Sequence, residues 1–260
     1  MRAWVQTVPP TVHSYVSFEQ TAHWFGLRGY EILRFDVEEL NQGRLDADLL
    51  EKPEEMVLRG GVETVHKALR RANKPLPKNL DLPESLQPWF GRNIGPTTLG
   101  EVRARVDRPD FQPLHIKPLN QHKLFTGYVV RAFRDLIPTA SLSDDVLVLA
   151  QGVVEFRSEW RAYILRDEIL HVGRYRGEPL MFPDPKIMTQ ALQALQNRPI
   201  AFGMDWGITS TGATLLVEVN DGYPLGNYGL SGPEYTAMIE ARWRELLGLP
   251  DNGVGRIHFD

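Results

Sequence analysis

The sequence has no cysteine among its 260 residues. This excludes disulfide bonds, thiolate metal sites and a cysteine nucleophile, and it favours a cytoplasmic protein. Long hydrophobic runs are also missing, because no stretch reaches the roughly 18 apolar residues of a membrane-spanning helix. The N-terminal sequence MRAWVQTVPP lacks the apolar segment of a signal peptide. We therefore expect no signal peptide and no membrane association.

Neither sign of charge is in large excess, with 29 basic against 33 acidic residues. No general attraction to nucleic acid results, and no nucleic-acid partner is predicted. Hydrophobic residues make up 42% of the chain and charged residues 24%, as is typical of a globular protein. The length suffices for one large domain or two medium domains with real cores.

The first third of the sequence alternates between strand and helix patterns. Apolar patterns predict a strand over residues 2–8, a helix over 14–29 and a strand over 30–35. A further strand at 55–59 precedes two glycines and a helix over 62–73. This order predicts a small, open, mostly parallel sheet.

Residues 74–112 are rich in proline, asparagine, glycine and charge, with one short helix expected near 98–105. Such a segment is typical of a connection between two lobes.

The stretch GMDWGITSTGATLLVEVN (residues 203–220) alternates between apolar and polar residues on both sides of a Thr-Ser-Thr-Gly cluster. This pattern predicts two strands joined by a turn at residues 209–212. The turn implies the following pairs across the strands: Ile208 with Ala213, Asp205 with Leu216, and Gly203 with Glu218. One face of the hairpin would then belong to the core, through Met204, Trp206, Ile208, Leu215, Val217 and Val219.

The other face of this hairpin would carry Asp205, Glu218 and Asn220. Asp205 and Glu218 would be diagonal neighbours, with about 7–8 Å between their backbones. Two like charges so placed repel unless a cation lies between them, and oxygen ligands of this kind suit Mg²⁺. A solvated polar face without a ligand is the alternative, and the hairpin alone does not decide between them.

A second hairpin is predicted from SEWRAYILRDEILHVGRYRG (residues 158–177), with its turn at Asp167 and Glu168. This turn would place Arg161 opposite Arg174, and Glu159 opposite Arg176. Directly opposed arginines destabilise a sheet unless they extend into solvent or hold an anion, and guanidinium groups bind phosphate or carboxylate through paired hydrogen bonds. Asp-Glu is a poor type I′ turn, so a longer loop with a shifted register stays open.

Two lysines precede these hairpins. Lys117 ends an apolar strand in LHIKPL, and Lys123 lies in the loop NQHKLFTG. A lysine at such a strand end needs an anionic partner or a route to water, so the pair suits phosphate, with solvent-directed side chains as the alternative. An apolar strand follows at residues 146–156, broken by Gln151 and Gly152. Cations early in this half and acids late in it would enclose a polyphosphate with Mg²⁺.

The segments HIKPL, LAQGVVEFRSEWRAYI, GMDWG and LLVEVNDG resemble, in their order and spacing, the nucleotide-binding half of the ATP-grasp superfamily. Glu-Trp-Arg at 159–161, Arg174 and Lys117, with the NDGYPLGNYGL loop, are similar to the clade named for two arginines and one lysine. The resemblance covers roughly residues 107–248. It implies an α/β (α+β) ATP-grasp fold with the nucleotide cleft between two lobes. A βαβ-type N-terminal domain (1–106) would precede an ATP-grasp domain (107–260).

The resemblance also implies roles for particular residues. Lys117 would contact the α- and β-phosphates of ATP, and Lys123 would reach them from the lid loop, which lacks the glycines of the common ATP-grasp pattern. Backbone groups from Gln151 to Val153 would meet the adenine, and Glu159 would lie near the ribose. Asp205, Glu218 and Asn220 would bind Mg²⁺. Arg161 and Arg174 would bind the γ-phosphate, or an acyl-phosphate and its carboxylate.

The chemistry implied by the resemblance is ATP-dependent carbon–nitrogen ligation through an acyl-phosphate. The partners would be a small-molecule or peptide carboxylate and an amine, with a homodimer as one option for assembly. Phosphoryl transfer to a non-amine acceptor on the same fold is the first alternative. A nucleotide-binding module without turnover is the second, and the intact set Asp205, Glu218 and Asn220 argues against it.

Overall fold

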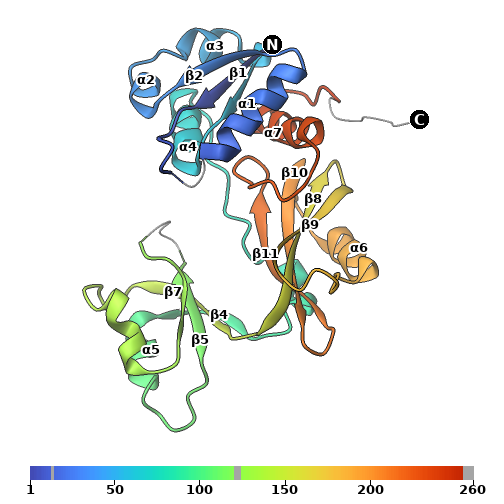
Figure 1. The fold of residues 1–260 in the computed structure, drawn as a ribbon. Coiled ribbons are helices and arrows are strands. Elements are labelled where there is room, and N and C mark those ends of the chain that lie inside the picture. The colour runs from blue at the N-terminus through green and yellow to red at the C-terminus, as the bar shows by residue number, and fades with distance from the viewer. Residues whose placement is uncertain (13–14, 120–123, 254–260) are drawn as a thin grey trace. The chain divides into compact units, whose positions relative to one another are not determined.

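The computed structural model describes residues 1–12, 15–119 and 124–253 (Figure 1). The chain forms two compact units, one of Met1–Trp89 with Arg157–Asp260 and the other of Phe90–Phe156. The division into domains 1–106 and 107–260 stays a prediction. Within the described residues, no helix has the length and apolarity that crossing a membrane requires.

The first unit begins with a three-stranded parallel sheet. Its strands are β1 (Arg2–Gln6), β2 (Glu31–Phe35) and β3 (Met56–Arg59), in the order β2-β1-β3. The segments between and after these strands form α1 (Tyr15–Leu27), α2 (Val37–Asn41), α3 (Asp46–Glu51), the 3₁₀ helix η1 (Pro53–Glu55) and α4 (Val62–Arg71). The predicted small parallel sheet is confirmed.

Helix α1 packs through one stripe, because its buried residues recur at helical spacing and are Phe18, Thr21, Ala22 and Phe25. Helix α4 begins at the two glycines after β3. The Gln6 side chain at the end of β1 accepts a hydrogen bond from the Gly61 amide at 2.9 Å. One of the amides left without a partner at the start of α4 is satisfied in this way.

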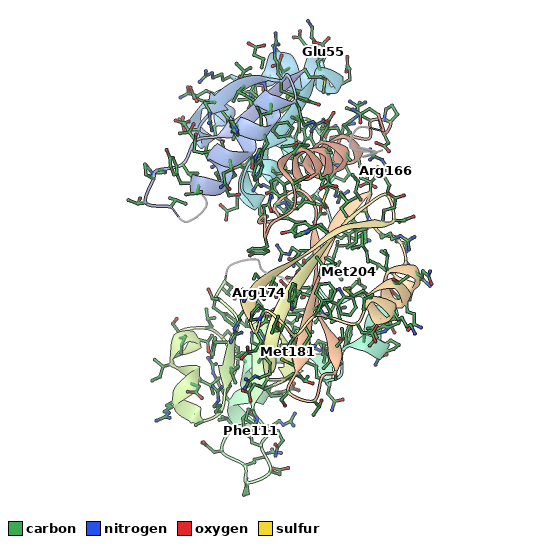
Figure 2. The ribbon with its side chains drawn as sticks, turned by 45° about the vertical axis from the view of Figure 1, so that its right-hand side comes forward. Glu55, Phe111, Arg166, Arg174, Met181 and Met204 are labelled. Atoms are coloured by element: carbon green, nitrogen blue, oxygen red, sulfur yellow. The ribbon has the colours of Figure 1, made fainter. Side chains whose placement is uncertain are left out.

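The first unit also holds a four-stranded antiparallel sheet in the order β11-β10-β8-β9. Its strands are β8 (Phe156–Leu165), β9 (Glu168–Gly177), β10 (Ala201–Thr209) and β11 (Thr214–Asp221), with α6 (Pro185–Ala194) between β9 and β10. Figure 2 labels Met204 on β10 and Arg166 at the turn between β8 and β9. The outer strand β11 is bridged by the connecting segment before η2 (Glu84–Trp89), because the Val219 amide donates to the Asp81 carbonyl at 2.6 Å.

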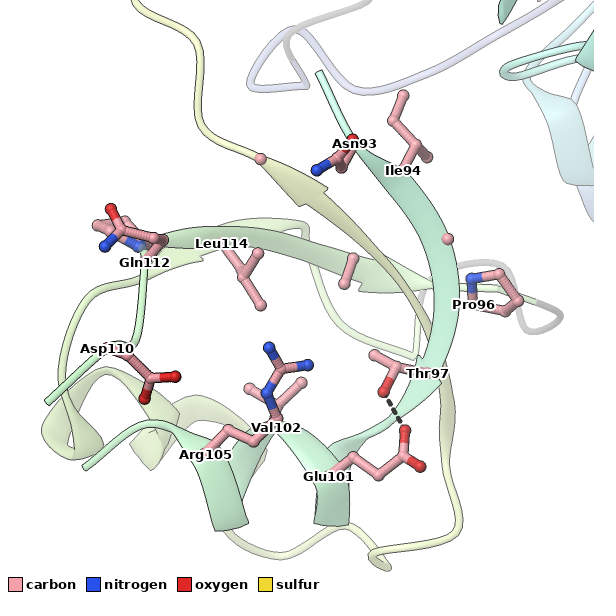
Figure 3. Close-up of a pocket in the computed structure, with 14 residues that line it drawn as sticks. Asn93, Ile94, Pro96, Thr97, Glu101, Val102, Arg105, Asp110, Gln112 and Leu114 are labelled. Atoms are coloured by element: carbon pink, nitrogen blue, oxygen red, sulfur yellow. Dashed lines mark hydrogen bonds between the residues drawn. The ribbon is translucent and has the colours of Figure 1, made fainter. Parts of the chain in front are cut away.

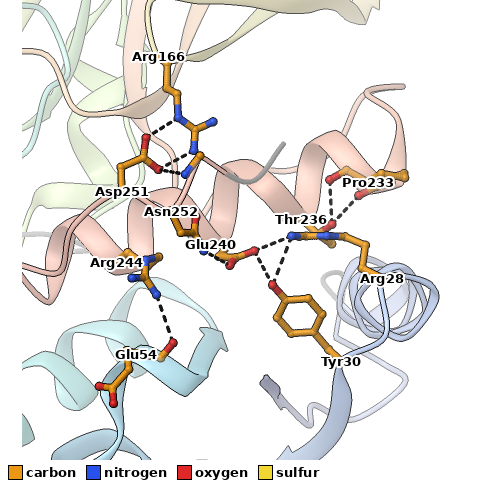
Figure 4. A network of polar contacts seen from close by, with 12 residues as sticks. Arg28, Tyr30, Glu54, Arg166, Pro233, Thr236, Glu240, Arg244, Asp251 and Asn252 are labelled. Atoms are coloured by element: carbon orange, nitrogen blue, oxygen red, sulfur yellow. Dashed lines mark hydrogen bonds and ion pairs between the residues drawn. The ribbon is translucent and has the colours of Figure 1, made fainter. Parts of the chain in front are cut away.

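Helix α7 (Gly232–Leu246) packs against α1, β3 and β10 and so joins the two sheets of the first unit. At its centre the buried Glu240 accepts hydrogen bonds from Arg28 at 2.6 Å and from Tyr30 at 2.7 Å (Figure 4). Burial and the Glu240 carboxylate together raise the pKa of Tyr30, so the phenol stays protonated as a donor. Arg244, near the C-terminal end of α7, donates a hydrogen bond to the Glu54 carbonyl at 3.2 Å.

The second unit is an antiparallel sheet in the order β4-β7-β5-β6, with helix α5 packed against it. Its elements are β4 (Ile94–Thr98), α5 (Leu99–Arg105), β5 (Leu114–Pro118), β6 (Tyr128–Val130), the 3₁₀ helix η3 (Phe133–Thr139) and β7 (Leu147–Gly152). The helix predicted near 98–105 is confirmed. It begins where Thr98 and Glu101 form a reciprocal capping box.

Candidate functional site

The β10–β11 hairpin turns where the sequence predicts, but its strands pair in a different register. Gly212, at the turn, has a φ of +82°, which glycine adopts without strain. The predicted pairing of Asp205 with Leu216 is wrong, because Asp205 lies directly opposite Glu218, and Asn220 lies opposite Gly203. The acids are therefore nearest neighbours across the strands and not diagonal ones.

Two one-residue shifts explain this difference: Ile208 pairs with Thr214 and not with the predicted Ala213, and a β-bulge follows further along the strands. The register shifts between Asp205 and Trp206, so that Val217 is an extra residue on β11. One extra residue inverts the alternation of faces on its strand. Met204, Trp206, Ile208 and Val219 are buried as predicted, whereas Leu216 replaces Leu215 and Val217 in the core.

The three predicted metal ligands lie together on this hairpin. The Asn220 amide nitrogen donates to Glu218 Oε1 at 2.9 Å and to Asp205 Oδ2 at 3.3 Å. The amide thus bridges two carboxylates that face each other on adjacent strands. Two carboxylates and one amide form an oxygen-rich set that a small hard cation prefers.

Asp205 is bound tightly by Arg161, which reaches it from β8. Arg161 Nε and Nη2 donate to Oδ1 and Oδ2 of Asp205, both at 2.7 Å. Only 2% of Asp205 and 9% of Arg161 are exposed, so the pair is largely removed from water. Sequence reasoning missed this ion pair, since it assigned Arg161 to an anionic ligand.

The electrostatics around Asp205 favour an additional positive charge. Burial raises the pKa of the Asp205 carboxyl to about 6; Arg161 opposes this rise, and the nearby Glu218 and Glu159 charges add to it. Burial by itself lowers the pKa of Arg161, but the hydrogen bonds to Asp205 outweigh it and raise that pKa. Arg161 therefore does not fully offset the effect of burial and of the neighbouring acids on Asp205.

The β8–β9 hairpin departs from its predicted register at the turn and in the middle of its strands, but not at the end away from the turn. Its turn consists of Arg166 and Asp167, both with positive φ, one residue earlier than predicted. Two register shifts follow, between Tyr163 and Ile164 and between Glu159 and Trp160. The predicted pair of Glu159 with Arg176 is confirmed, because the two bulges together compensate for the displaced turn.

Between the two bulges the predicted pairing of Arg161 with Arg174 is wrong. Arg161 lies opposite Gly173, and Arg174 lies opposite Trp160. Because Arg161 and Trp160 are consecutive on β8, the two arginines belong to opposite faces of the sheet. Arg174 is exposed and donates to the Gly177 carbonyl (Figure 2 labels its position). The argument from opposed arginines therefore fails, while the role predicted for Arg174 stays a prediction.

Glu159 is buried on the same face as Arg161, two residues away along β8. Its carboxylate accepts hydrogen bonds from Arg176 at 2.6 Å and from the Tyr175 hydroxyl at 3.1 Å. Burial, with the charges of Asp205 and Glu159, raises the pKa of Tyr175, so its hydroxyl remains a donor.

Tyr228 also belongs to this site, and sequence reasoning did not single it out. Its ring lies over the Arg161 guanidinium, 5.2 Å from ring centroid to Cζ, and 5.2 Å from the Tyr175 ring. The Tyr163 hydroxyl holds the surrounding loop by accepting from the Tyr228 amide at 2.8 Å. The feature of the sequence that goes with this contact is the glycine at position 173. A Cβ added there would lie 1.9 Å from the Tyr228 carbonyl oxygen.

The same loop is fixed from the other sheet by Arg59, the buried last residue of β3. Arg59 donates to the Tyr223 carbonyl at 3.1 Å and to the Tyr235 hydroxyl at 3.1 Å. Tyr235 in turn donates to the Leu225 carbonyl. An arginine at the end of a buried strand was a sequence signal for such a role, since a buried charge needs partners.

The second unit carries the residues predicted to contact the nucleotide. Lys117 pairs with Leu149, and His115 pairs with Gln151, so Lys117 and Gln151 share one face of the sheet. Gln151 is buried, and its side-chain amide oxygen Oε1 accepts hydrogen bonds from Arg92 Nε at 3.1 Å and Nη2 at 3.0 Å. Val153 follows β7 and is 43% exposed. Lys123 lies outside the described residues.

No group of three or more histidine, cysteine, aspartate or glutamate side chains in the described part of the chain is arranged to hold a metal ion. Asp205, Glu218 and Asn220 nevertheless fit Mg²⁺, which proteins usually hold by one or two carboxylates together with substrate phosphates. Arg161 and Asn220 use only part of the acceptor capacity of Asp205, since an ionised carboxylate offers about four lone-pair positions.

Comparisons with known proteins match the fold. The chain is similar to the structure of D-cycloserine synthetase DcsG, with a TM-score of 0.59, 14% identity and coverage of 95% of this chain and 100% of that one. It is similar to D-alanine–D-alanine ligase from Bacillus anthracis complexed with ATP, with a TM-score of 0.52, 14% identity and 94% coverage of each chain. A third similar structure is the ATP-grasp ligase PsnB complexed with minimal precursor, with a TM-score of 0.52, 15% identity and coverage of 92% and 98%.

No curated protein matches the sequence. The family described as "ATP-grasp domain, R2K clade family 2" matches residues 89–238. These residues include the strands of the second unit, both hairpins of the first unit and the Asp205, Glu218 and Asn220 set. The chain belongs to the ATP-grasp superfamily, in family 2 of its R2K clade.

Proposed function

We propose that this protein is an ATP-dependent ligase that joins a carboxylate to an amine. The family supports ATP as substrate, and two similar structures are named as a D-alanine–D-alanine ligase complexed with ATP and an ATP-grasp ligase complexed with a precursor. The observation that carries the proposal is the convergence of Asp205, Glu218 and Asn220 on adjacent strands. The carboxylate partner is a small molecule or a peptide.

In this proposal Asp205, Glu218 and Asn220 hold Mg²⁺. A Mg²⁺ ion bound by these residues would supply positive charge to offset the charge of the nucleotide phosphates during transfer of the γ-phosphoryl group. Arg161 fixes the Asp205 carboxylate through two hydrogen bonds, and Asn220 holds Glu218 in place. Such fixed side chains need little rearrangement when the ligand binds, which favours catalysis by a prearranged site.

The remaining residues are assigned to the nucleotide and the transferred group. Lys117 contacts the α- and β-phosphates, with Lys123 reaching them from the lid. The backbone from Gln151 to Val153 meets the adenine, and Glu159 lies near the ribose. Arg174 is assigned to the γ-phosphate or the carboxylate, whereas Arg161, on the other face of the sheet, acts through the Asp205 carboxylate that it binds.

The chemistry proceeds in two steps. A carboxylate oxygen attacks the γ-phosphorus of ATP, the bond to the β-phosphate oxygen breaks, and ADP leaves. The amine nitrogen then attacks the acyl carbon, the carbon–oxygen bond to phosphate breaks, and the nitrogen loses a proton as the amide forms. No protein nucleophile takes part, so the residues act by positioning and by neutralising charge.

Glu218→Gln tests the proposal. The amide keeps the size of the side chain but removes the charge, and we expect a fall in Mg²⁺-dependent ATP turnover of about a hundredfold or more. The variant is measured over a Mg²⁺ titration, with circular dichroism to confirm folding. Glu168→Gln, a change at an exposed residue of β9, is the matched control and should leave turnover unchanged.

Product analysis distinguishes the ligase from other outcomes. A ligase yields ADP, phosphate and an amide, at a rate that depends on the amine. A stable phosphorylated acceptor would instead make the protein a phosphotransferase. Nucleotide binding without turnover across a panel of amino acids and peptides would contradict both. Unchanged turnover in Glu218→Gln would refute the metal assignment itself.

A further inference from the structure

The second unit contains a cavity of about 610 Å³ on the α5 side of its sheet (Figure 3). Its floor includes Leu114 of β5 with Ala150 and Gly152 of β7, and Val102 of α5 lines it from the helix. Leu114 pairs with Gly152 across the sheet. A volume in this range suits a small organic molecule.

This cavity is separate from the surface assigned to the nucleotide. Ala150 and Gly152 alternate along β7 with Gln151, and side chains alternate between the two faces of a strand. The cavity therefore lies on the reverse face of the strand that carries Gln151.

Two opposite charges are directed into the cavity. Figure 3 shows the Arg105 guanidinium, from the last residue of α5, in the middle of the cavity, and the Asp110 carboxylate directed into the same space. Within the described part of the chain, neither side chain forms an ion pair or a hydrogen bond, with each other or with any other residue. Both charges are thus available to a ligand.

The other acid of the cavity is already engaged. Glu101 accepts from the Thr97 hydroxyl and caps α5 by bonding the Thr98 amide, and these bonds, with a smaller effect of the Arg105 charge, lower its pKa. Asp110 is then the anionic side chain that can bind a ligand cation, and Arg105 is the cationic side chain that can bind a ligand anion. A phosphate would be repelled by Asp110, and a metal ion would find one carboxylate beside a guanidinium.

We propose that this cavity binds a free α-amino acid with an apolar side chain. Arg105 takes the carboxylate, for which a guanidinium is well suited, and Asp110 takes the ammonium group. Val102, Leu114 and Ala150 cover the apolar side chain of the ligand. The site is distinct from the proposed ligase site, because neither Arg105 nor Asp110, nor the side chains that cover the ligand, are assigned to ATP, to Mg²⁺ or to the transferred group.

Calorimetric titration of L-leucine into the full chain without nucleotide tests the site. Leucine should bind, whereas leucinamide, which lacks the carboxylate, and N-acetyl-leucine, which lacks the ammonium group, should each bind about tenfold more weakly or worse. Arg105→Gln and Asp110→Asn should each weaken leucine binding by about tenfold or more. Arg108→Gln and Asp107→Asn change exposed neighbours that do not line the cavity, and they should bind as the unmodified chain does.

A charge exchange makes the test stricter. The double variant R105D/D110R keeps one charge of each sign in the cavity, so it should recover part of the leucine binding that each single variant loses. Absence of leucine binding to the unmodified chain would overturn the proposal. Equal binding of leucine, leucinamide and N-acetyl-leucine, or normal binding by Arg105→Gln and Asp110→Asn, would overturn it as well.

Discussion

β-Bulges shift the strand register in both hairpins of the antiparallel sheet, but with different results for the charged side chains. In β10–β11 a one-residue shift at the turn and a single bulge at Val217 together bring Asp205 directly opposite Glu218. In β8–β9 a displaced turn and two bulges restore one predicted pair and separate another, so that Arg161 faces Gly173 and leaves Arg174 on the other face. The position of each bulge therefore decides which charged side chains meet, although the order of strands is unchanged.

The comparison also separates two kinds of charge. Arg161 is buried and bound through both donors to Asp205, while the side chain of Arg176, bound to Glu159, is 71% exposed. Removing one partner of a pair that is buried on both sides leaves an uncompensated charge, whereas water can replace an exposed cation such as Arg176. The same type of substitution in the two places should therefore have very different effects.

The largest effect is expected from Arg161→Met. This change leaves Asp205 buried without its cation and should lower the free energy of unfolding by about 3–5 kcal/mol. Urea unfolding measures the loss. Arg176→Met is the comparison and should cost less, because water can replace the exposed Arg176 while Glu159 keeps the hydrogen bond from Tyr175. Equal losses in the two variants would mean that burial does not distinguish the pairs.

Gly173→Ala should be next in size. A Cβ at this position would meet the Tyr228 carbonyl oxygen at 1.9 Å, so the loop over Arg161 must move. Overpacking of this kind costs about 1–3 kcal/mol, read as a lower midpoint of thermal unfolding. Gly95→Ala in β4 adds a Cβ with no atom within 4 Å and should be nearly neutral. A neutral Gly173→Ala would show that Tyr228 is not held against β9.

These contacts indicate how far the sequence alone could go. The strand and helix order of the N-terminal sheet followed from apolar periodicity, and the set Asp205, Glu218 and Asn220 followed from hairpin alternation. The ion pair of Arg161 with Asp205 did not, since it joins strands from different hairpins and no local pattern encodes that distance. The bulges were also beyond reach, because an extra residue such as Val217 is indistinguishable in sequence from a regular strand residue.

Arg174→Ala tests the arginine that the bulges moved away from Arg161. Because Arg174 is exposed and its side chain bonds the Gly177 carbonyl at the end of the same strand, stability should change by less than about 0.5 kcal/mol. If Arg174 binds the transferred group, kcat should fall while the affinity for ATP is kept. Arg157→Ala, another exposed arginine of the same hairpin, is the control. Normal kcat in Arg174→Ala would remove Arg174 from the site.

The smallest effect is expected at the turn that sets the register of β8–β9. Arg166, in that turn, pairs with Asp251 through two hydrogen bonds. The hydrogen bond to Arg166 lowers the pKa of Asp251, so folding is favoured by the ionised carboxylate. This contribution is present above the ordinary aspartate pKa and is lost as the pH falls through the lowered value in the folded state.

Asp251→Asn should therefore cost less than about 1 kcal/mol near neutral pH, because the pair is partly exposed. The difference between the variant and the unmodified chain should shrink as the pH falls below about 4, where aspartate takes up its proton in the unfolded chain. Urea unfolding at pH 7 and at successively lower pH measures it. A difference that grows with acidity would contradict the direction of the shift.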